Sequence, residues 1–114
     1  MRTISTLALD AALVLVFAAI GRASHGEDLT PAGLAATAWP FLVAVLIGSA
    51  LGRRLGGSSW WRQGAVVWLV TVVLGVALRV LGRATAAPSF VVVTAAMLGV
   101  LLLGWRRLAR KRLA

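Results

Sequence analysis

The stretch from Gly64 to Gly82 reads GAVVWLVTVVLGVALRVLG and holds a single charged residue, Arg79. The hydrocarbon core of a bilayer is about 30 Å thick, so a helix rising about 1.5 Å per residue needs roughly 20 apolar residues to cross it. Apolar and polar residues do not alternate at a period of two, which disfavours a strand of a membrane barrel. The stretch is therefore predicted to cross a membrane as an α-helix, because helices and closed barrels are the structures that satisfy their backbone in lipid.

Three further runs of the same kind lie outside it, at residues 4–21, 31–52 and 86–105. The 114 residues are 61% hydrophobic and 13% charged, with a mean hydropathy of +0.95, whereas a water-soluble domain has about 25% charged residues. We predict an all-α, integral membrane four-helix bundle forming a single transmembrane domain over residues 1–114, with residues 106–114 as a basic cytoplasmic tail. Arg2 before an apolar run also fits a signal peptide, but Asp10 within that run favours an uncleaved helix.

Positive charge is concentrated on one side of the predicted bundle, in the residues Arg2, Arg53, Arg54, Arg62, Arg106, Arg107, Arg110, Lys111 and Arg112. The formal charges on the other side sum to zero, so the net charge of +9 lies on one face. Because cytoplasmic segments retain lysine and arginine, we predict a multi-pass protein of the inner cell membrane with both termini in the cytoplasm. Trp60, Trp61 and Trp105 flank the basic segments and are expected to anchor the helices at the level of the lipid headgroups. The lipid bilayer is thus the expected partner, with anionic lipid at the basic tail and no nucleic acid.

Two pairs of segments indicate a duplicated helical hairpin. Residues 37–41 (TAWPF) resemble residues 85–90 (TAAPSF), and residues 21–24 (GRAS) resemble residues 82–85 (GRAT). Each unit would contain two crossings, so the two copies would share an orientation. Chance recurrence of small residues in apolar sequence is the alternative explanation.

The start of the second span admits two interpretations. Thr30 and Pro31 have the pattern of a helix cap followed by a first-turn proline, which starts the helix at Pro31. Pro40 then falls inside the helix, where it frees the carbonyl of Ala36 and bends the span. The alternative starts the helix at Thr37, with Pro40 in its first turn, and leaves a short span. We favour the bent helix.

Small and polar residues form stripes along two of the spans. The third span contains Gly64, Trp68, Thr71, Gly75, Arg79 and Gly82, and the second contains Gly33, Thr37, Ala44, Gly48 and Gly52. Such stripes must face protein, because small residues permit close backbone approach and lipid offers no partner for arginine. Gly48, Gly52 and Gly75 are therefore predicted to pack against other helices. The partner helix belongs to the same chain or to another, so a homo-oligomer or a membrane-protein partner is left open.

Asp10 is an acid within the first span. It lies about 9 Å from the start of that span, and Thr71 lies about 10 Å from the same end of the third. An ionised carboxylate near mid-membrane costs at least about 2.5 kcal/mol. Within the predicted spans Asp10 has no basic partner at its own depth, since Arg79 lies about 13 Å farther along. We expect Asp10 either to be protonated and hydrogen-bonded to Thr71 or Ser49, or to line a wet path and carry protons.

The side away from the basic tail gathers most of the remaining versatile side chains. The candidate ligand-binding residues there are Arg22, His25, Glu27, Asp28, Trp39, Arg79 and Arg83. Arginines suit a phosphate, a carboxylate or a lipid headgroup, because a guanidinium donates two parallel hydrogen bonds. The alternative is that they pair with the two acids and close the bundle. His25 is the side chain best suited to acid–base work.

Other chemistry finds little support in the sequence. The absence of cysteine excludes disulfides, thiolate zinc sites and iron–sulfur clusters. A lone histidine beside two acids does not complete a zinc or haem site, so no metal or cofactor is predicted. No catalytic or phosphate-loop motif occurs in a supporting context, and an enzyme is not predicted.

Four segments together resemble a known family. They are residues 17–25 (FAAIGRASH), 37–41 (TAWPF), 68–79 (WLVTVVLGVALR) and 104–106 (GWR). They resemble a family of short four-span bacterial membrane proteins, catalogued as domain of unknown function three thousand and fifty-four, over almost the whole chain. The resemblance implies the four-span topology, emphasises Arg22, His25, Trp39, Pro40 and Arg79, and assigns no activity.

Two functions from different classes fit these observations. In the first, the polar cluster binds a small anionic or lipid-like ligand, with transport coupled to Asp10; the size and span number are like those of small multidrug exporters, which is an analogy of fold alone. In the second, the protein is a structural or assembly subunit whose glycine stripes face partner helices. An intramembrane enzyme using His25 has less support.

Overall fold

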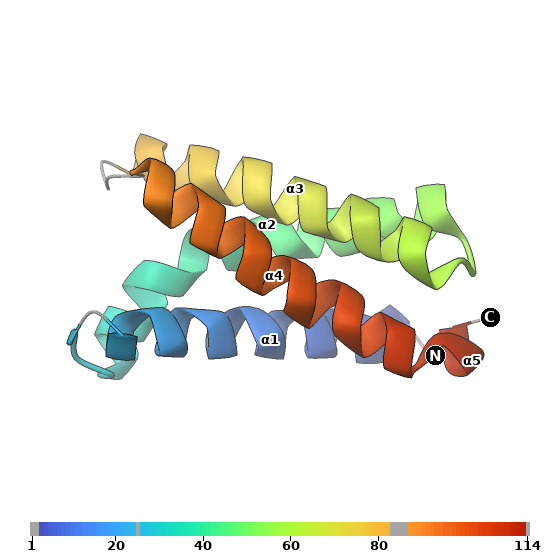
Figure 1. Ribbon diagram of the computed structural model, residues 1–114, viewed down its shortest axis with the longest axis horizontal. Coiled ribbons are helices and arrows are strands. Elements are labelled where there is room, and N and C mark those ends of the chain that lie inside the picture. The colour runs from blue at the N-terminus through green and yellow to red at the C-terminus, as the bar shows by residue number, and fades with distance from the viewer. Residues whose placement is uncertain (1–2, 25, 83–86, 114) are drawn as a thin grey trace.

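The computed structural model describes residues 3–24, 26–82 and 87–113. These residues form four long helices, α1 (Thr3–Ser24), α2 (Pro31–Gly56), α3 (Trp60–Leu81) and α4 (Pro88–Leu108), followed by the short α5 (Arg110–Leu113). No strand occurs in them. All four long helices are long and apolar enough to cross a membrane. The predicted all-α four-helix bundle is confirmed (Figure 1).

The helices run back and forth, so their ends gather at two ends of the bundle (Figure 1). The start of α1, the connection between α2 and α3, and α5 lie together at one of them. We call this the basic end because it carries the exposed side chains of Arg54, Arg62, Arg107, Arg110 and Lys111. The last turns of α1 and α3 and the first turns of α2 and α4 lie at the other, which we call the opposite end.

Helices α2 and α3 are the most extensively packed pair. Glycines on α2 set their close approach. A Cβ at Gly52 would lie 2.9 Å from the Gln63 carbonyl oxygen, and a Cβ at Gly56 would lie 2.6 Å from Gln63 Cα. Glycine permits such a backbone contact because it has no Cβ. Gly48 lies against Val67 in the same way, so the partner helix of this stripe belongs to the same chain.

Gly75 of α3 accommodates an aromatic ring nearer the opposite end. A Cβ there would lie 2.7 Å from Phe41 Cε1. The buried Phe41 ring meets Phe17 edge-on with ring centroids 5.3 Å apart, and its centroid lies 6.3 Å from that of Phe90. Tilted and edge-to-face arrangements are favourable for aromatic rings. These rings join α1, α2 and α4, and the rest of the buried core consists of Val14, Val45, Val67, Leu98 and Leu102.

Helix α2 begins where the cap pattern predicts. Thr30 is the N-cap, and its Oγ1 accepts a hydrogen bond from Gly33 N at 3.1 Å. Pro31 occupies the first turn, and Pro40 lies buried inside the helix. Figure 1 shows α2 bending near its start. The prediction of a start at Pro31 is confirmed, and the alternative start at Thr37 is wrong.

The helices extend past several of the predicted span ends. Helix α2 ends at Gly56 rather than at residue 52, α3 begins at Trp60 rather than at residue 64, and α4 ends at Leu108 rather than at residue 105. The predicted limits follow the apolar length that a bilayer needs, whereas a helix continues into water through good helix formers such as arginine and leucine. As a result Arg106, which is predicted to belong to the basic tail, lies within α4 with its side chain buried.

Candidate functional site

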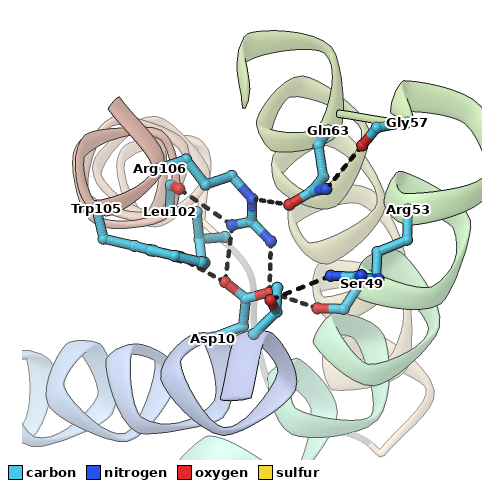
Figure 2. A network of polar contacts seen from close by, with 9 residues as sticks. Asp10, Ser49, Arg53, Gly57, Gln63, Leu102, Trp105 and Arg106 are labelled. Carbon is cyan, nitrogen blue, oxygen red and sulfur yellow. Dashed lines mark hydrogen bonds and ion pairs between the residues drawn. The ribbon is translucent and has the colours of Figure 1, made fainter. Parts of the chain in front are cut away.

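A buried polar network surrounds the carboxylate of Asp10 near the basic end (Figure 2). Both of its oxygens accept hydrogen bonds from Arg106, with Nη1 donating to Oδ1 at 2.8 Å and Nη2 donating to Oδ2 at 2.7 Å. Trp105 Nε1 donates to Oδ1 at 2.8 Å, and Ser49 Oγ donates to Oδ2. The side chains of Asp10 and Arg106 are both 0% exposed. They form an ion pair in the interior of the bundle.

The rest of the network is built around the guanidinium of Arg106. Its Nε donates to Gln63 Oε1 at 3.0 Å, and its Nη1 also donates to the Leu102 carbonyl at 3.1 Å. Gln63 Nε2 in turn donates to the Gly57 carbonyl at 3.2 Å (Figure 2). Asp10 lies on α1, Ser49 on α2, Gln63 on α3 and Arg106 on α4. All four long helices therefore meet in this network.

This geometry corrects the expectation that Asp10 has no basic partner at its depth. Charged residues inside a membrane are tolerated when they face the bundle interior and pair with one another. A buried pair also needs further hydrogen bonds to offset the loss of hydration. Asp10 receives these from Trp105 and Ser49, and Arg106 gives hydrogen bonds to Gln63 and Leu102. The expected hydrogen bond to Asp10 comes from Ser49, and Arg106 is the basic partner that the prediction missed.

The direction of helical side chains explains how Arg106 reaches Asp10. A side chain on a helix points back toward the N-terminus of that helix, so an arginine near the end of α4 extends into the span. The spacing of residues in α4 could have predicted that Arg106 is buried. Thr94, Leu98, Leu102 and Arg106 recur at every fourth position, and all four are buried. That spacing places Arg106 on the core-facing stripe of α4.

Two further expectations about this end change. Thr71 is buried near Gly48 but takes no part in the network, and its Oγ1 has no hydrogen-bond partner among the described residues. Of the two hydroxyls proposed as partners of Asp10, the structure selects Ser49. Trp105, expected to be an anchor at the membrane surface, points its indole N–H into the bundle toward Asp10.

The second polar region surrounds a cavity of about 510 Å³ at the opposite end. Helices α1 and α4 diverge toward this end (Figure 1), and residues of both line the cavity. Its apolar lining includes Phe17, Ala18, Ile20, Phe90, Val93 and Met97. Its polar lining includes Arg22, Ser24, Glu27, Thr37, Arg79, Ser89 and Thr94. The cavity extends from the first turn of α4 to Met97, which is roughly 13 Å along the helix axis.

Arg22 connects the end of α1 to the start of α2. Its Nη1 donates to Thr37 Oγ1 at 2.9 Å and lies 3.2 Å from a carboxylate oxygen of Glu27. Its Nε donates to the backbone carbonyl of Asp28. A Cβ at Gly33 would lie 2.9 Å from the guanidinium carbon, so glycine at this position leaves room for the arginine. These contacts match the alternative in which an arginine pairs with an acid and closes the bundle.

Arg79 lies on the other side of the cavity, in the last turn of α3. Its Cζ is 4.4 Å from the centroid of the Phe90 ring. A guanidinium over an aromatic face is attracted by the negative charge of the ring face. The contact holds the cation at the cavity wall between α3 and α4. The polar mouth is thus bordered by Arg22 on one side and Arg79 on the other.

The model of the family described as "Protein of unknown function (DUF3054)" matches residues 7–109. The chain belongs to this family. The number is that of the family named in the resemblance above, and the match leaves out residues 1–6 and 110–114. Neither a curated protein nor a solved structure matches the chain.

In this DUF3054 protein only part of the candidate set lies at the cavity. Arg22, Glu27 and Arg79 line it, whereas Asp28 contributes its backbone carbonyl to Arg22. Trp39 lies near Gly82, is 44% exposed and does not line the cavity. The candidates His25 and Arg83 lie outside the described residues. The apolar walls were missed because phenylalanine and methionine at helical spacing are typical of any core.

Proposed function

We propose that this membrane protein binds an anionic amphiphile, a molecule with a negatively charged head and an apolar tail, in the cavity between α1 and α4. The observation that carries the proposal is the division of the cavity lining. Arg22 and Arg79 lie in the last turns of their helices at the mouth, and Phe17 and Met97 lie deeper. The cavity volume of about 510 Å³ falls within the range of roughly 300–1,000 Å³ that buries most of a drug-sized ligand.

The charges of the lining favour an anion. Arg22, Arg79 and Glu27 line the cavity, so two basic residues stand there against one acidic residue. Arginine binds phosphate and carboxylate through planar, paired donors. Glu27 is 53% exposed at its side chain, so it can be displaced by a competing anion with little loss of burial.

The apolar part of the cavity has a way in from the membrane. Ile20 of α1 and Val93 of α4 line the cavity, and yet they are 42% and 56% exposed. In a bilayer such exposed apolar side chains of spanning helices face lipid. An apolar tail can therefore enter between the two helices while the charged head stays at the level of the arginines.

Decyl phosphate is expected to stabilise the protein in phosphatidylcholine nanodiscs, as measured by thermal unfolding. A ligand at 100 times its dissociation constant adds about 2.7 kcal/mol to the free energy of unfolding. Inorganic phosphate and uncharged decyl maltoside supply the head or the tail alone and are expected to give much smaller shifts. Replacing Arg79 by glutamine should weaken decyl phosphate binding about tenfold or more, since a hydrogen bond to a charged group contributes about 1.5–3 kcal/mol.

Arg62→Gln is the matched control, because Arg62 is an exposed arginine in the first turn of α3, at the basic end, and does not line the cavity. It should leave binding unchanged. Val93→Trp tests the apolar part of the site, because its larger side chain would fill the cavity. It should abolish the thermal stabilisation by decyl phosphate. Equal stabilisation of the wild-type protein and of Arg79→Gln, or an equal response to inorganic phosphate, would contradict an amphiphile site. A complete absence of any shift would favour the structural or assembly role.

The charge distribution supports an orientation as well. We infer that the basic end is cytoplasmic and the cavity opens on the outer side of the inner membrane, because arginine and lysine concentrate in cytoplasmic segments. The exposed guanidinium of Arg62 lies 5.3 Å from the Trp61 ring, and that of Arg107 lies 5.8 Å from the Trp60 ring. Such residues at a membrane surface attract anionic lipid headgroups at about 1 kcal/mol per basic residue.

Cysteine labelling is expected to report this orientation directly, because the natural chain contains no cysteine. Ser58→Cys lies in the connection at the basic end, and Leu29→Cys lies in the exposed connection at the opposite end. In intact cells a membrane-impermeant maleimide should label Leu29→Cys and leave Ser58→Cys unlabelled. Labelling of Ser58→Cys alone would reverse the orientation, and labelling of both on intact cells would exclude a single orientation.

A further inference from the structure

The contact between α1 and α4 differs along its length. At the opposite end the two helices diverge (Figure 1), and residues of both line the cavity. Near the basic end they are joined by the ion pair of Asp10 with Arg106 and by the hydrogen bond from Trp105 (Figure 2). These two helices pack against each other much less than either packs against its other neighbour in the bundle. The seam between them is therefore open at one end and closed by one polar cluster at the other.

An apolar layer separates the cavity from that cluster. Val14 of α1 and Leu98 and Leu102 of α4 are fully buried between the two levels. Phe17 and Met97, which line the cavity, come next to this layer along their helices. The seam thus contains in order an open amphipathic cavity, an apolar layer and a polar closure. This order matches one state of a carrier that opens to one side of the membrane at a time.

The hydrogen bonds of the closure are divided so that either helix can leave the other. If α1 and α4 separate, Asp10 keeps the hydroxyl of Ser49, which comes from α2. Arg106 keeps the amide of Gln63, which comes from α3, and the carbonyl of Leu102 on its own helix. Neither charge would be left without a polar partner, and water entering from the basic end would supply the rest. The closely packed α2 and α3 would remain together as the fixed part.

We propose that the protein moves its amphiphile across the membrane, and that the Asp10–Arg106 pair, with Trp105, is the gate at the basic end. This rests on the proposed ligand site. Opening the gate at the basic end brings α1 and α4 together at the opposite end and closes the cavity there, so the ligand faces one side at a time. Asp10 in this mechanism acts by releasing Arg106, and it is a gate residue rather than a residue that touches the ligand.

The gate is tested with single cysteines at the two levels of the seam. Ser89→Cys lies at the cavity, where Ser89 is exposed, and Leu102→Cys lies in the buried apolar layer, on the side of the polar closure. In otherwise natural protein in proteoliposomes, an impermeant maleimide should label Ser89→Cys from the opposite end and should leave Leu102→Cys unlabelled from both sides. The double substitution Asp10→Asn with Arg106→Gln removes both charges together and leaves no unpaired buried charge.

In that double variant, Leu102→Cys should become labelled from the basic end about tenfold faster or more, as a state that was populated below about 10% becomes the major one. Labelling of Ser89→Cys from the opposite end should fall at the same time. Arg107→Gln is the matched control, since Arg107 is an exposed neighbour that does not contact Asp10, and it should change neither rate. A rise at Leu102→Cys with no fall at Ser89→Cys would indicate loosened packing and would overturn the gate, as would unchanged labelling at both positions.

Movement of the ligand across the membrane is measured separately, with fluorescent lysophosphatidylglycerol in the vesicle membrane. Dithionite added outside reduces the fluorophore in the outer leaflet and leaves the fluorophore in the inner leaflet protected. Protein should accelerate loss of the protected fluorescence relative to empty vesicles, and Val93→Trp, which fills the cavity, should abolish that acceleration. Equal rates with and without protein would overturn transport. A positive decyl phosphate shift together with that result would leave the binding site standing, so the two proposals fail in different experiments.

Discussion

Replacing Arg106 with methionine is expected to lower the free energy of unfolding by about 3–5 kcal/mol, because it leaves a buried carboxylate without its ionic partner. Arg106 supplies two of the hydrogen bonds that Asp10 accepts. Methionine fills a similar apolar volume along the helix, so lost packing accounts for little of the effect. Thermal unfolding in detergent micelles, followed by circular dichroism, measures the change against the natural protein.

Two companion variants show whether the charge is the cause. Arg107→Met removes an exposed arginine whose guanidinium lies over the Trp60 ring at 5.8 Å, and it should cost no more than about 1 kcal/mol. Adding Asp10→Leu to Arg106→Met should recover most of the lost stability, because apolar residues of similar volume replace a buried ion pair at little cost. If Arg106→Met were as stable as Arg107→Met, the ion pair would not contribute to the free energy of unfolding.

Gly56→Ala is expected to destabilise the protein by about 1–3 kcal/mol through overpacking between α2 and α3. The new Cβ would lie 2.6 Å from Gln63 Cα and 2.9 Å from the carbonyl carbon of Arg62. These are backbone atoms, so no side-chain rotation relieves the clash, and the first turn of α3 must shift. That shift would also displace Gln63 from Arg106. The measurement is thermal unfolding together with the folded yield after purification.

Gly104→Ala is the control for this substitution. Gly104 is also helical, but a Cβ there would meet nothing within 4 Å. Alanine favours a helix over glycine by up to about 1 kcal/mol, so this variant should be as stable as the natural protein or more so. Equal effects of Gly56→Ala and Gly104→Ala would mean that α2 and α3 can separate without penalty, contrary to their packing.

The buried polar residues of α1 and α4 show what the sequence pattern of a single helix can and cannot predict. The face containing Thr6, Asp10 and Val14 is visible in the sequence, and these residues are indeed buried. The stripe from Thr94 to Arg106 on α4 is equally regular. Each stripe indicates which side of its own helix turns inward. Neither indicates that the two stripes meet, because the residues that pair are separated by nearly the whole chain.

The sequence by itself determined four helices long and apolar enough to cross a membrane, and the concentration of basic residues at one end of the bundle. It could do so because the bilayer requires about 20 apolar residues for each helix and every spanning helix satisfies its own backbone, so both properties are local. Only the tertiary structure decided that Arg106 reaches back to Asp10 and that α1 and α4 part to form a cavity. These depend on which helices are neighbours and how far they diverge, and side chains from distant parts of the chain set both.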